Sequence, residues 1–275
     1  MILPRFLWAV WLRMPDALRL SAYKLLLWIG KKLYDRGSAY TQRVPFDLFI
    51  KYGSGVRRTE AAATDYVAKH TSIPVPRVLD TLQDSRGHTL ILMTRLPGLP
   101  FGLHYQIQDL TPTEASAFEA TLKDWLSQLR ALPAPSEVVC AFDGSPCRSN
   151  SVMHDRDFGP FSTQHEFHEF LYTQIPRRFH DDLRKKATMS HTKDHRIVLT
   201  HGDLHPNNIL MHDRQLSGFV DWECAGWFPE YWEYADAVET RPNYKAWCDI
   251  FHRIFPQYKQ ELEVEGAFRK VANPW

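Results

Sequence analysis

Residues 201–210 have the sequence HGDLHPNNIL, and the tetrapeptide VDWE follows at residues 220–223. These segments contain a carboxylate at Asp203, an amide oxygen at Asn208 and a second carboxylate at Asp221. In enzymes that transfer phosphoryl groups, one carboxylate accepts the proton of the attacking hydroxyl, while other oxygen ligands hold Mg²⁺ against the phosphates. Such oxygen ligands suit magnesium. The residue types and their order therefore indicate magnesium-assisted phosphoryl transfer.

The local sequence predicts how the first of these segments is positioned. A short strand is expected over residues 197–200. It leads into residues 201–208, which must form a loop because Gly202 frees the backbone and Pro206 prevents a helix.

A hairpin is expected directly after this loop. Its strands are predicted over residues 208–212 and 217–221. The hairpin folds Asp221 back towards Asn208, so both side chains can converge with Asp203 although 18 residues separate the two carboxylates.

A different chemistry is open for the same loop. His201, Asp203 and His205 alternate along the chain as H-x-D-x-H, and such side chains can bind zinc or iron in a hydrolase. The surrounding sequence lacks the additional histidines and acids expected of that centre. A metal-dependent hydrolase is therefore kept as an alternative.

The N-terminal half provides a lysine and an acid in suitable places. Residues 46–52 are rich in aromatic and β-branched residues, which predicts a strand with Lys51 near its end. Thr59 is a candidate cap for a helix over residues 60–70. Glu60 would start this helix, where it could pair with Lys51 and steady the lysine over phosphates. By spacing alone, both residues could equally be ordinary surface charges.

Two further strands are predicted over residues 78–82 and 88–94. The second runs into residues 95–98, which end in Pro and Gly and are typical of a connection between lobes. Its backbone could hydrogen-bond the edge of an adenine ring, although a plain loop is the alternative. We place the domain boundary here. Residues 1–98 would form an N-terminal helix plus a small nucleotide-binding lobe, and residues 99–275 a helical lobe with the catalytic loop and acceptor site.

Beyond residue 98 the pattern is mainly helical. Helices are expected over residues 113–132 and 164–174. Residues 133–160 are rich in Pro, Gly, Ser and Asn, which makes them a candidate lid or substrate loop, or else a surface excursion. Five residues form the apolar stripe of the first helix: Phe118, Leu122, Trp125, Leu126 and Leu129.

The segment after Asp221 is rich in aromatic residues. We interpret most of them as packing residues, while one or two could line an apolar acceptor pocket. They are Trp222, Trp227, Phe228, Tyr231, Trp232 and Tyr234.

Residues 15–34 are predicted to form the first long helix. It would pack on the body of the protein through its apolar face. That face is formed by Leu18, Ala22, Leu25, Leu26, Ile29 and Leu33. Alternatively, the helix would lie on a membrane surface through its basic residues. These are Arg13, Arg19, Lys24, Lys31 and Lys32.

Composition excludes several classes of protein. The chain has 275 residues, of which 44% are hydrophobic and 24% charged, as expected of a globular protein large enough for two lobes. The net charge of +1 and the lack of an arginine-rich stripe argue against nucleic acid as a partner. No apolar run approaches the roughly 20 residues of a membrane span. The four cysteines form no C-x-x-C pair, which fits packing thiols in a cytoplasmic protein.

Together these motifs resemble a known family. The segments H-G-D-L-x-x-x-N and D-W-E are similar to the signature of the aminoglycoside phosphotransferase and choline kinase-like family, relatives of the protein kinases. More loosely, residues 43–98 resemble the small lobe of a subset common in filamentous fungi. The resemblance implies an α+β, two-lobed protein-kinase-like fold, with a small antiparallel-sheet N-lobe and a larger, mainly helical C-lobe.

The resemblance also implies an activity, the transfer of the γ-phosphate of ATP to a hydroxyl of a small-molecule acceptor. Asp203 would orient or deprotonate that hydroxyl, and Asn208 with Asp221 would hold Mg²⁺ against the phosphates. For the nucleotide, the implied residues are Lys51, Glu60, and the backbone of Met93, Thr94 and Arg95.

One departure from the family pattern supports another function class. Protein kinases cover the phosphates with G-x-G-x-x-G ahead of the lysine strand, but only Gly37 lies in the corresponding stretch here. A pseudokinase, a binding module or an enzyme of another reaction type is therefore the alternative. A polycationic aminoglycoside is not the expected acceptor, because the sequence shows no dense acidic cluster.

Overall fold

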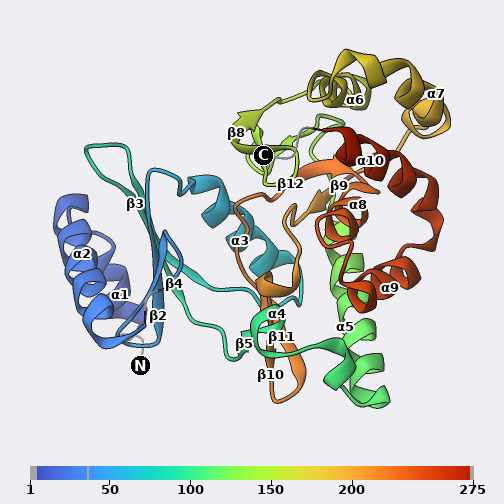
Figure 1. Cartoon of the computed structure of the whole chain (residues 1–275). Coiled ribbons are helices and arrows are strands. Elements are labelled where there is room, and N and C mark those ends of the chain that lie inside the picture. Colours follow the sequence, from blue (N-terminus) through green and yellow to red (C-terminus); the bar gives the residue numbers. More distant parts are fainter. Residues whose placement is uncertain (1–4, 36, 273–275) are drawn as a thin grey trace. The chain divides into compact units, whose positions relative to one another are not determined.

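The computed structural model describes residues 5–35 and 37–272. The chain divides into two compact units, and Figure 1 labels many of their elements. The first unit comprises Met1–Lys69 and Pro74–Leu96. The second unit comprises His70–Ile73 and Pro97–Trp275.

The first unit is built on a four-stranded antiparallel sheet with the strand order β1-β2-β4-β3. Three helices accompany this sheet. The elements are α1 (Arg5–Trp11), α2 (Asp16–Leu33), β1 (Thr41–Val44), β2 (Leu48–Gly53), α3 (Arg58–His70), β3 (Val78–Gln83) and β4 (Thr89–Thr94).

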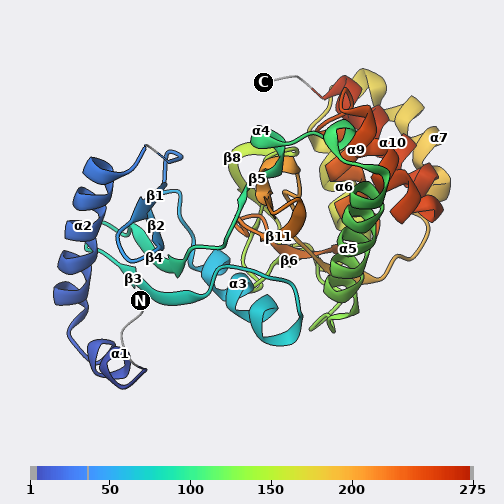
Figure 2. The ribbon, with the colours of Figure 1, turned by 90° about the horizontal axis from the view of Figure 1, so that it is seen from below.

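Helices cover both faces of this sheet, as Figure 2 shows for α2 and α3. Successive residues of a strand point to opposite faces. Leu92 of β4 therefore packs with Leu27 of α2, and its neighbour Ile91 packs with Ala61 of α3 on the other face. The sheet is thus the middle layer of the first unit.

A buried ion pair attaches α2 to the sheet. Arg19 of α2 pairs with Asp80 of β3, and both side chains are buried. Asp80 also accepts a hydrogen bond from Tyr23 Oη at 2.8 Å. Trp11 of α1 donates through Nε1 to the same tyrosine oxygen at 2.6 Å. Polar contacts therefore link α1 and α2 to β3.

The apolar face predicted for the first long helix is wrong in part, although its Leu26 does pack against the core under the sheet. Leu18, Leu25 and Leu33 are exposed. The face turned to the sheet is selected by the ion pair of Arg19 and by a close approach of backbones, because a Cβ on Gly30 would lie 2.4 Å from the carbonyl oxygen of Arg43. The buried residues of α2 are Arg19, Tyr23, Leu27 and Gly30.

Two predicted boundaries in the first unit also need correction. The strand with Lys51 begins at Leu48, because Phe46 and Asp47 have φ values of 71° and 60° and form a turn after β1. Thr59 lies inside α3, which begins at Arg58, and so does not cap that helix.

The second unit is mainly helical. Its helices are α4 (Phe101–His104), α5 (Pro112–Ala131), α6 (Gln164–Thr173), α7 (His180–His191), α8 (Trp232–Glu239), α9 (Lys245–Ile254) and α10 (Lys259–Val271), with 3₁₀ turns η1 (Ile107–Asp109), η2 (Arg177–Phe179), η3 (Pro206–Asn208) and η4 (Pro256–Tyr258). Its strands are β5 (Leu99–Pro100), β6 (Cys140–Ala141), β7 (Cys147–Ser149), β8 (Met153–Phe158), β9 (Ile197–Thr200), β10 (Ile209–His212), β11 (Gln215–Phe219) and β12 (Gly226–Pro229).

These strands form three small sheets, with the orders β11-β10-β5, β6-β12-β9 and β7-β8. Residues 133–160 are therefore not the long irregular loop that their composition predicts. They contain β6, β7 and β8, and β6 extends the sheet of β12 and β9. Such short strands pair with residues far along the chain, so they leave little periodicity in their own sequence.

The long helix α5 agrees with the sequence. Its predicted stripe of five apolar residues is buried. The helix begins one residue earlier than expected, with a capping box between Thr111 and Glu114. Gln128 of α5 accepts a hydrogen bond from the backbone N–H of Ser72 at 2.8 Å, and the neighbouring Ile73 is buried. The segment of residues 70–73 is thereby attached to the second unit.

The aromatic residues after Asp221 are buried packing residues, as predicted. The four cysteines are buried and reduced. None of the described helices is both long enough and apolar enough to cross a membrane.

Candidate active site

Two loops of the second unit lie side by side because the strands next to them are paired. β9 precedes residues 201–208, and β12 follows residues 220–225. The two strands are antiparallel, with Gly226 opposite Thr200. In addition, the backbone N–H of Val220 donates to the carbonyl oxygen of Asn208 at 3.0 Å. The hairpin of β10 and β11 thus returns the DWE segment to the HGDL loop.

A buried acid holds the start of the HGDL loop. Glu233 of α8 accepts hydrogen bonds from the backbone N–H groups of His201 at 2.5 Å and Gly202 at 3.3 Å. Gly202 has a φ of 76°, and a Cβ there would lie 2.2 Å from the carbonyl oxygen of Cys224, so glycine is required. Burial raises the pKa of Glu233 to about 8, although the two N–H donors lower it.

His201 connects the two loops. Its ring is fully buried, and Nε2 donates to the carbonyl oxygen of Val220 at 3.0 Å. The ring also lies against Trp222, with 4.6 Å between the ring centroids. These contacts give His201 a structural role in joining the two loops.

The same contacts argue against a hydrolase centre built from H-x-D-x-H. Nε2 of His201 is directed to Val220, and Nδ1 of His205 accepts a hydrogen bond from the backbone N–H of Asn207 at 3.2 Å. Both histidines therefore use a ring nitrogen to brace the backbone.

Asp203 and Asn208 are joined by two hydrogen bonds. Nδ2 of Asn208 donates to the backbone oxygen of Asp203 at 2.8 Å and to its carboxylate Oδ2 at 3.1 Å. Nε2 of His205 lies 3.6 Å from the same carboxylate oxygen. The turn of η3 thus brings the predicted acid and the predicted amide together and fixes the orientation of the acid.

Asp203 is surrounded by other carboxylates. The pKa of Asp203 is raised to about 8 by burial and then by the negative charges of Asp236, Asp221 and Glu223. The hydrogen bond from Asn208 lowers it. A divalent cation would relieve this repulsion. Carboxylate and amide oxygens are ligands that Mg²⁺ accepts, so the residues present fit that ion.

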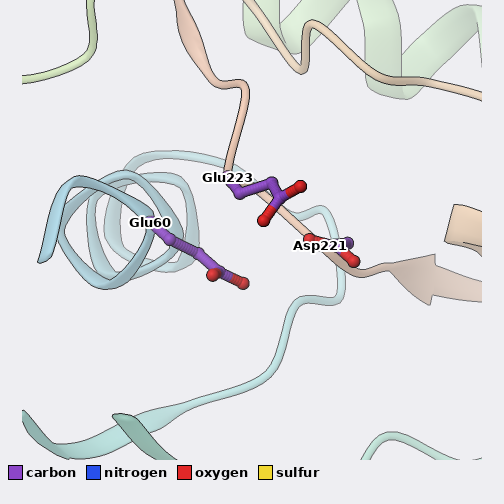
Figure 3. Close-up of side chains that lie close together, drawn as sticks. All are labelled: Glu60, Asp221 and Glu223. Carbon is purple, nitrogen blue, oxygen red and sulfur yellow. The ribbon is translucent and has the colours of Figure 1, made fainter. Parts of the chain in front are cut away.

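The DWE segment contributes two acids, shown in Figure 3. Carboxylate oxygens of Asp221 and Glu223 lie within 4.8 Å of each other. Asp221 has a φ of 69°, a conformation that is costly for a residue with a side chain and is frequent at functional sites. Glu223 Oε2 lies 3.7 Å from Nη1 of Arg148 on β7. The segment of residues 133–160 therefore reaches the site.

Glu233 and Asp236 were not predicted from the sequence. They are three residues apart in α8 and so lie on one side of that helix. Asp236 is buried and accepts from Arg269 Nη2 at 3.0 Å. The aromatic residues around them dominate the sequence of this segment, so the two acids were not singled out. The sequence does contain one signal for them, namely two acids three residues apart within an aromatic segment that is expected to be buried. Buried acids need partners, so such a pair indicates a site.

In the first unit, Lys51 and Glu60 form a buried ion pair. Nζ of Lys51 lies 2.7 Å from Oε1 of Glu60, and both residues are buried. Glu60 projects from the first turn of α3, as Figure 3 shows. A buried ion pair adds little to stability because both charges lose their hydration. The pair is therefore a candidate for a functional role.

The predicted adenine-contacting segment lies at the end of β4. Met93 is buried. The backbone N–H of Thr94 donates to the carbonyl oxygen of Arg77, and that of Arg95 donates to the carbonyl oxygen of Asp47, each at 3.0 Å. An adenine edge would therefore have to use other backbone atoms of this segment.

Among the described residues, no glycine-rich hairpin precedes the strand of Lys51. α2 leads to β1 and then to β2, with Gly37 in the connection. Gly53 and Gly55 come later, and a Cβ on either would lie 2.5 or 2.8 Å from the ring of Tyr40. These two glycines therefore allow the backbone to pack closely against Tyr40.

An open groove of about 450 Å³ lies beside the HGDL loop. Gly102 is on its wall and touches the loop, since a Cβ there would lie 2.4 Å from Oδ1 of Asn207. The pKa of His205 is lowered by burial and then by the positive charge of Arg241 in the groove. The polar and aromatic residues of the lining are Tyr105, Gln106, Thr240, Arg241, Asn243 and Tyr244.

A small antiparallel-sheet unit and a larger helical unit define the protein-kinase-like fold, and the solved structures agree. The crystal structure of aminoglycoside phosphotransferase APH(4)-Ia matches with a TM-score of 0.61 and 17% identity over 92% of this chain and 89% of that chain. The GDP and kanamycin complex of APH(2")-IIia matches with a TM-score of 0.62 and 13% identity over 91% and 89%. At these identities the likeness concerns the fold.

The sequence itself gives the family. Residues 54–268 match the model of the phosphotransferase enzyme family. The chain therefore belongs to this family, as its H-G-D-L-x-x-x-N and D-W-E motifs predict. No curated protein matches the sequence.

Proposed function

We propose that this protein is an ATP- and Mg²⁺-dependent phosphotransferase that moves the γ-phosphoryl group to a hydroxyl of a small molecule. The observation that carries the proposal is the setting of Asp203, which Asn208 orients and which is buried among three other carboxylates. Such surroundings favour proton uptake, as a general base requires. The nucleotides named in related structures add support, since a ternary complex of an APH(4)-Ia mutant contains ADP and hygromycin B.

The bond changes follow from these roles. Asp203 accepts the proton of the acceptor hydroxyl, whose oxygen bonds to the γ-phosphorus. The bond from that phosphorus to the leaving oxygen of ADP breaks. Asn208 and Asp221 would hold Mg²⁺, which supplies positive charge to the phosphates. Because Nδ2 of Asn208 is bonded to Asp203, its amide oxygen is the atom that would face the cation.

The nucleotide would be held by the first unit. In this proposal, Lys51 contacts the phosphates and Glu60 keeps the ammonium in place, which the 2.7 Å ion pair supports. Adenine would lie against the backbone of residues 93–95. Because two N–H groups of this segment are already bonded, we expect modest selection between ATP and GTP.

The acceptor would enter the groove beside the HGDL loop. Its lining combines two tyrosines with amide and hydroxyl groups and one cation, Arg241. A hydroxylated neutral or anionic molecule fits this lining better than a polycationic aminoglycoside, because Arg241 repels cations.

The first prediction tests Asp203 directly. Replacing Asp203→Asn removes the proton acceptor and retains the shape of the side chain. We expect transfer from ATP and Mg²⁺ to components of a metabolite extract to fall at least about 100-fold, with nucleotide affinity nearly unchanged. Phosphorylated products are measured by mass spectrometry and nucleotide binding by calorimetry. Asp213→Asn, at an exposed turn, is the control. Normal turnover by Asp203→Asn would show that the role of Asp203 is wrong.

A second function is favoured by one observation, the lack of a glycine-rich hairpin ahead of Lys51 among the described residues. The fold would then serve as a pseudokinase or binding module. A ligand that binds the folded state raises its thermal stability. A melting temperature that does not respond to ATP, GTP or Mg²⁺ would support this second function over the first.

A further inference from the structure

The outer face of α2 is apolar although its inner face is already packed. Tyr23 and Leu27 of α2 belong to the core under the sheet. On the other side, Leu18, Leu25 and Trp28 are 48%, 57% and 61% exposed. Spacings of seven and three residues place these three side chains in one stripe of the helix. A helix that only covered the sheet would be polar there.

The preceding helix α1 also exposes apolar side chains. Phe6, Leu7 and Val10 are exposed, whereas Trp8 and Trp11 pack towards the core. Of fourteen exposed large apolar side chains among the described residues, nine precede residue 34. Such a concentration marks an interaction surface. We call it the α1–α2 surface, formed by Phe6, Leu7, Val10, Leu18, Leu25 and Trp28.

The α1–α2 surface lies in a basic part of the chain. Residues 1–35 contain six basic and two acidic residues, a net charge of +4, whereas the whole chain carries +1. Arg13, Lys31 and Lys32 are exposed. Lys32 follows Leu25 by seven residues, so it lies in the apolar stripe itself. A partner of this surface must therefore accept apolar side chains and positive charges on the same face of α2.

We propose that the α1–α2 surface docks on an anionic lipid membrane. Tryptophan and aliphatic side chains would enter the interface between headgroups and acyl chains, while the lysines and Arg13 reach the acidic headgroups. This fits both the apolar stripe and the excess of positive charge. A second copy of the chain would satisfy the apolar stripe but would bring its own exposed Arg13, Lys31 and Lys32 to the same surface, where like charges repel.

The test is co-sedimentation of the full chain with vesicles of phosphatidylcholine alone or mixed with phosphatidylserine. We expect binding to the mixed vesicles that weakens as salt is added. The double variant Leu25→Glu with Trp28→Glu should bind at least about tenfold more weakly, because two side chains no longer enter the interface. Lys31→Glu with Lys32→Glu should lose the preference for phosphatidylserine. Met189→Glu, at an apolar residue that is 70% exposed on α7, should bind like the native chain.

Melting temperatures and light scattering complete the experiment. Unchanged melting shows that a loss of binding comes from the surface and not from unfolding. The proposal is overturned if the native chain does not bind the mixed vesicles, or if the Leu25/Trp28 variant binds them equally well. It is also overturned if the native chain is a dimer that this variant converts to a monomer, since the surface would then be a self-interface.

Discussion

At the scale of residues, Glu60 of the first unit and Asp203 of the second have different electrostatic surroundings. In the first unit, Glu60 is balanced by Lys51 at 2.7 Å. In the second, Asp203 stands among acids, and its pKa is raised to about 8 by burial and by Asp236, Asp221 and Glu223. A balanced pair supplies a fixed cation for an anionic ligand, whereas carboxylates gathered around one acid raise its pKa and attract a cation.

Replacing Lys51→Met tests the balanced pair. The change leaves a buried carboxylate without its ammonium, so we expect a loss of about 3 kcal/mol in the free energy of unfolding. The double variant Lys51→Met with Glu60→Gln removes both charges and should recover most of that stability, measured by chemical denaturation. Lys69→Met, at an exposed lysine on the same helix as Glu60, is the control.

Affinity for ATP separates the structural and functional contributions of this pair. If Lys51 binds phosphates, the double variant should be stable and yet lose at least about tenfold in affinity for ATP. A stable double variant with native affinity would mean that the pair only supports the fold.

At the scale of elements, the sequence predicts the parts whose information is local. The strand before His201 is predicted correctly, and the apolar stripe of α5 is buried as expected. The convergence of Asp203 with Asn208 follows from a five-residue turn, so it could also be predicted. These elements depend on neighbours in the sequence.

Other elements depend on partners far along the chain. The buried side of α2 is decided by Arg19 and its partner Asp80, which are 61 residues apart. Because α2 is apolar on both sides, hydrophobic periodicity could not select the packed one. Glu233 and Asp236 were missed for a related reason, because both act on the HGDL loop, which is distant from them in the sequence. The β6 strand owes its pairing to β12.

The ion pair of Arg19 and Asp80 gives a prediction at this scale. Arg19→Met should reduce the free energy of unfolding by about 3–5 kcal/mol, because Asp80 stays buried without its cation. Hydrogen exchange should accelerate across α2 before the rest of the first unit. Arg13→Met, at an exposed arginine, should change neither quantity. Equal protection of α2 in both variants would contradict the anchoring role.

At the scale of the whole molecule, the buried His168 makes the stability of the fold depend on pH. The rings of His168 on α6 and His191 on α7 are stacked, with centroids 4.0 Å apart. Nε2 of His168 is 2.9 Å from the hydroxyl of Tyr231. The pKa of His168 is lowered to about 3 by burial and then by the charges of His191 and His195. The helices of the second unit therefore pack around a neutral imidazole.

This histidine gives a prediction for pH. His168 has an ordinary pKa of 6.5, which is higher than in the folded state, so its contribution to stability is complete above pH 6.5 and is lost as the pH falls towards the folded value. Between pH 6.5 and about 4.5 the loss should be roughly 2–3 kcal/mol. His168→Gln should flatten the fall in melting temperature over this range, whereas His212→Gln, at an exposed histidine, should not. Parallel curves for His168→Gln and the native chain would contradict this.

The short segment of residues 70–73 has a consequence for how this protein could be divided. It follows α3 in the chain but belongs to the second unit, where Ser72 is bonded to Gln128 and Ile73 is buried. A fragment ending at Leu96 would expose Ile73, and a fragment beginning at Pro97 would lack it. No single cut therefore separates the units intact. Recombination between relatives could therefore not exchange the unit that contains Lys51 alone. The surface of α5 that contacts residues 70–73 would have to be exchanged with it.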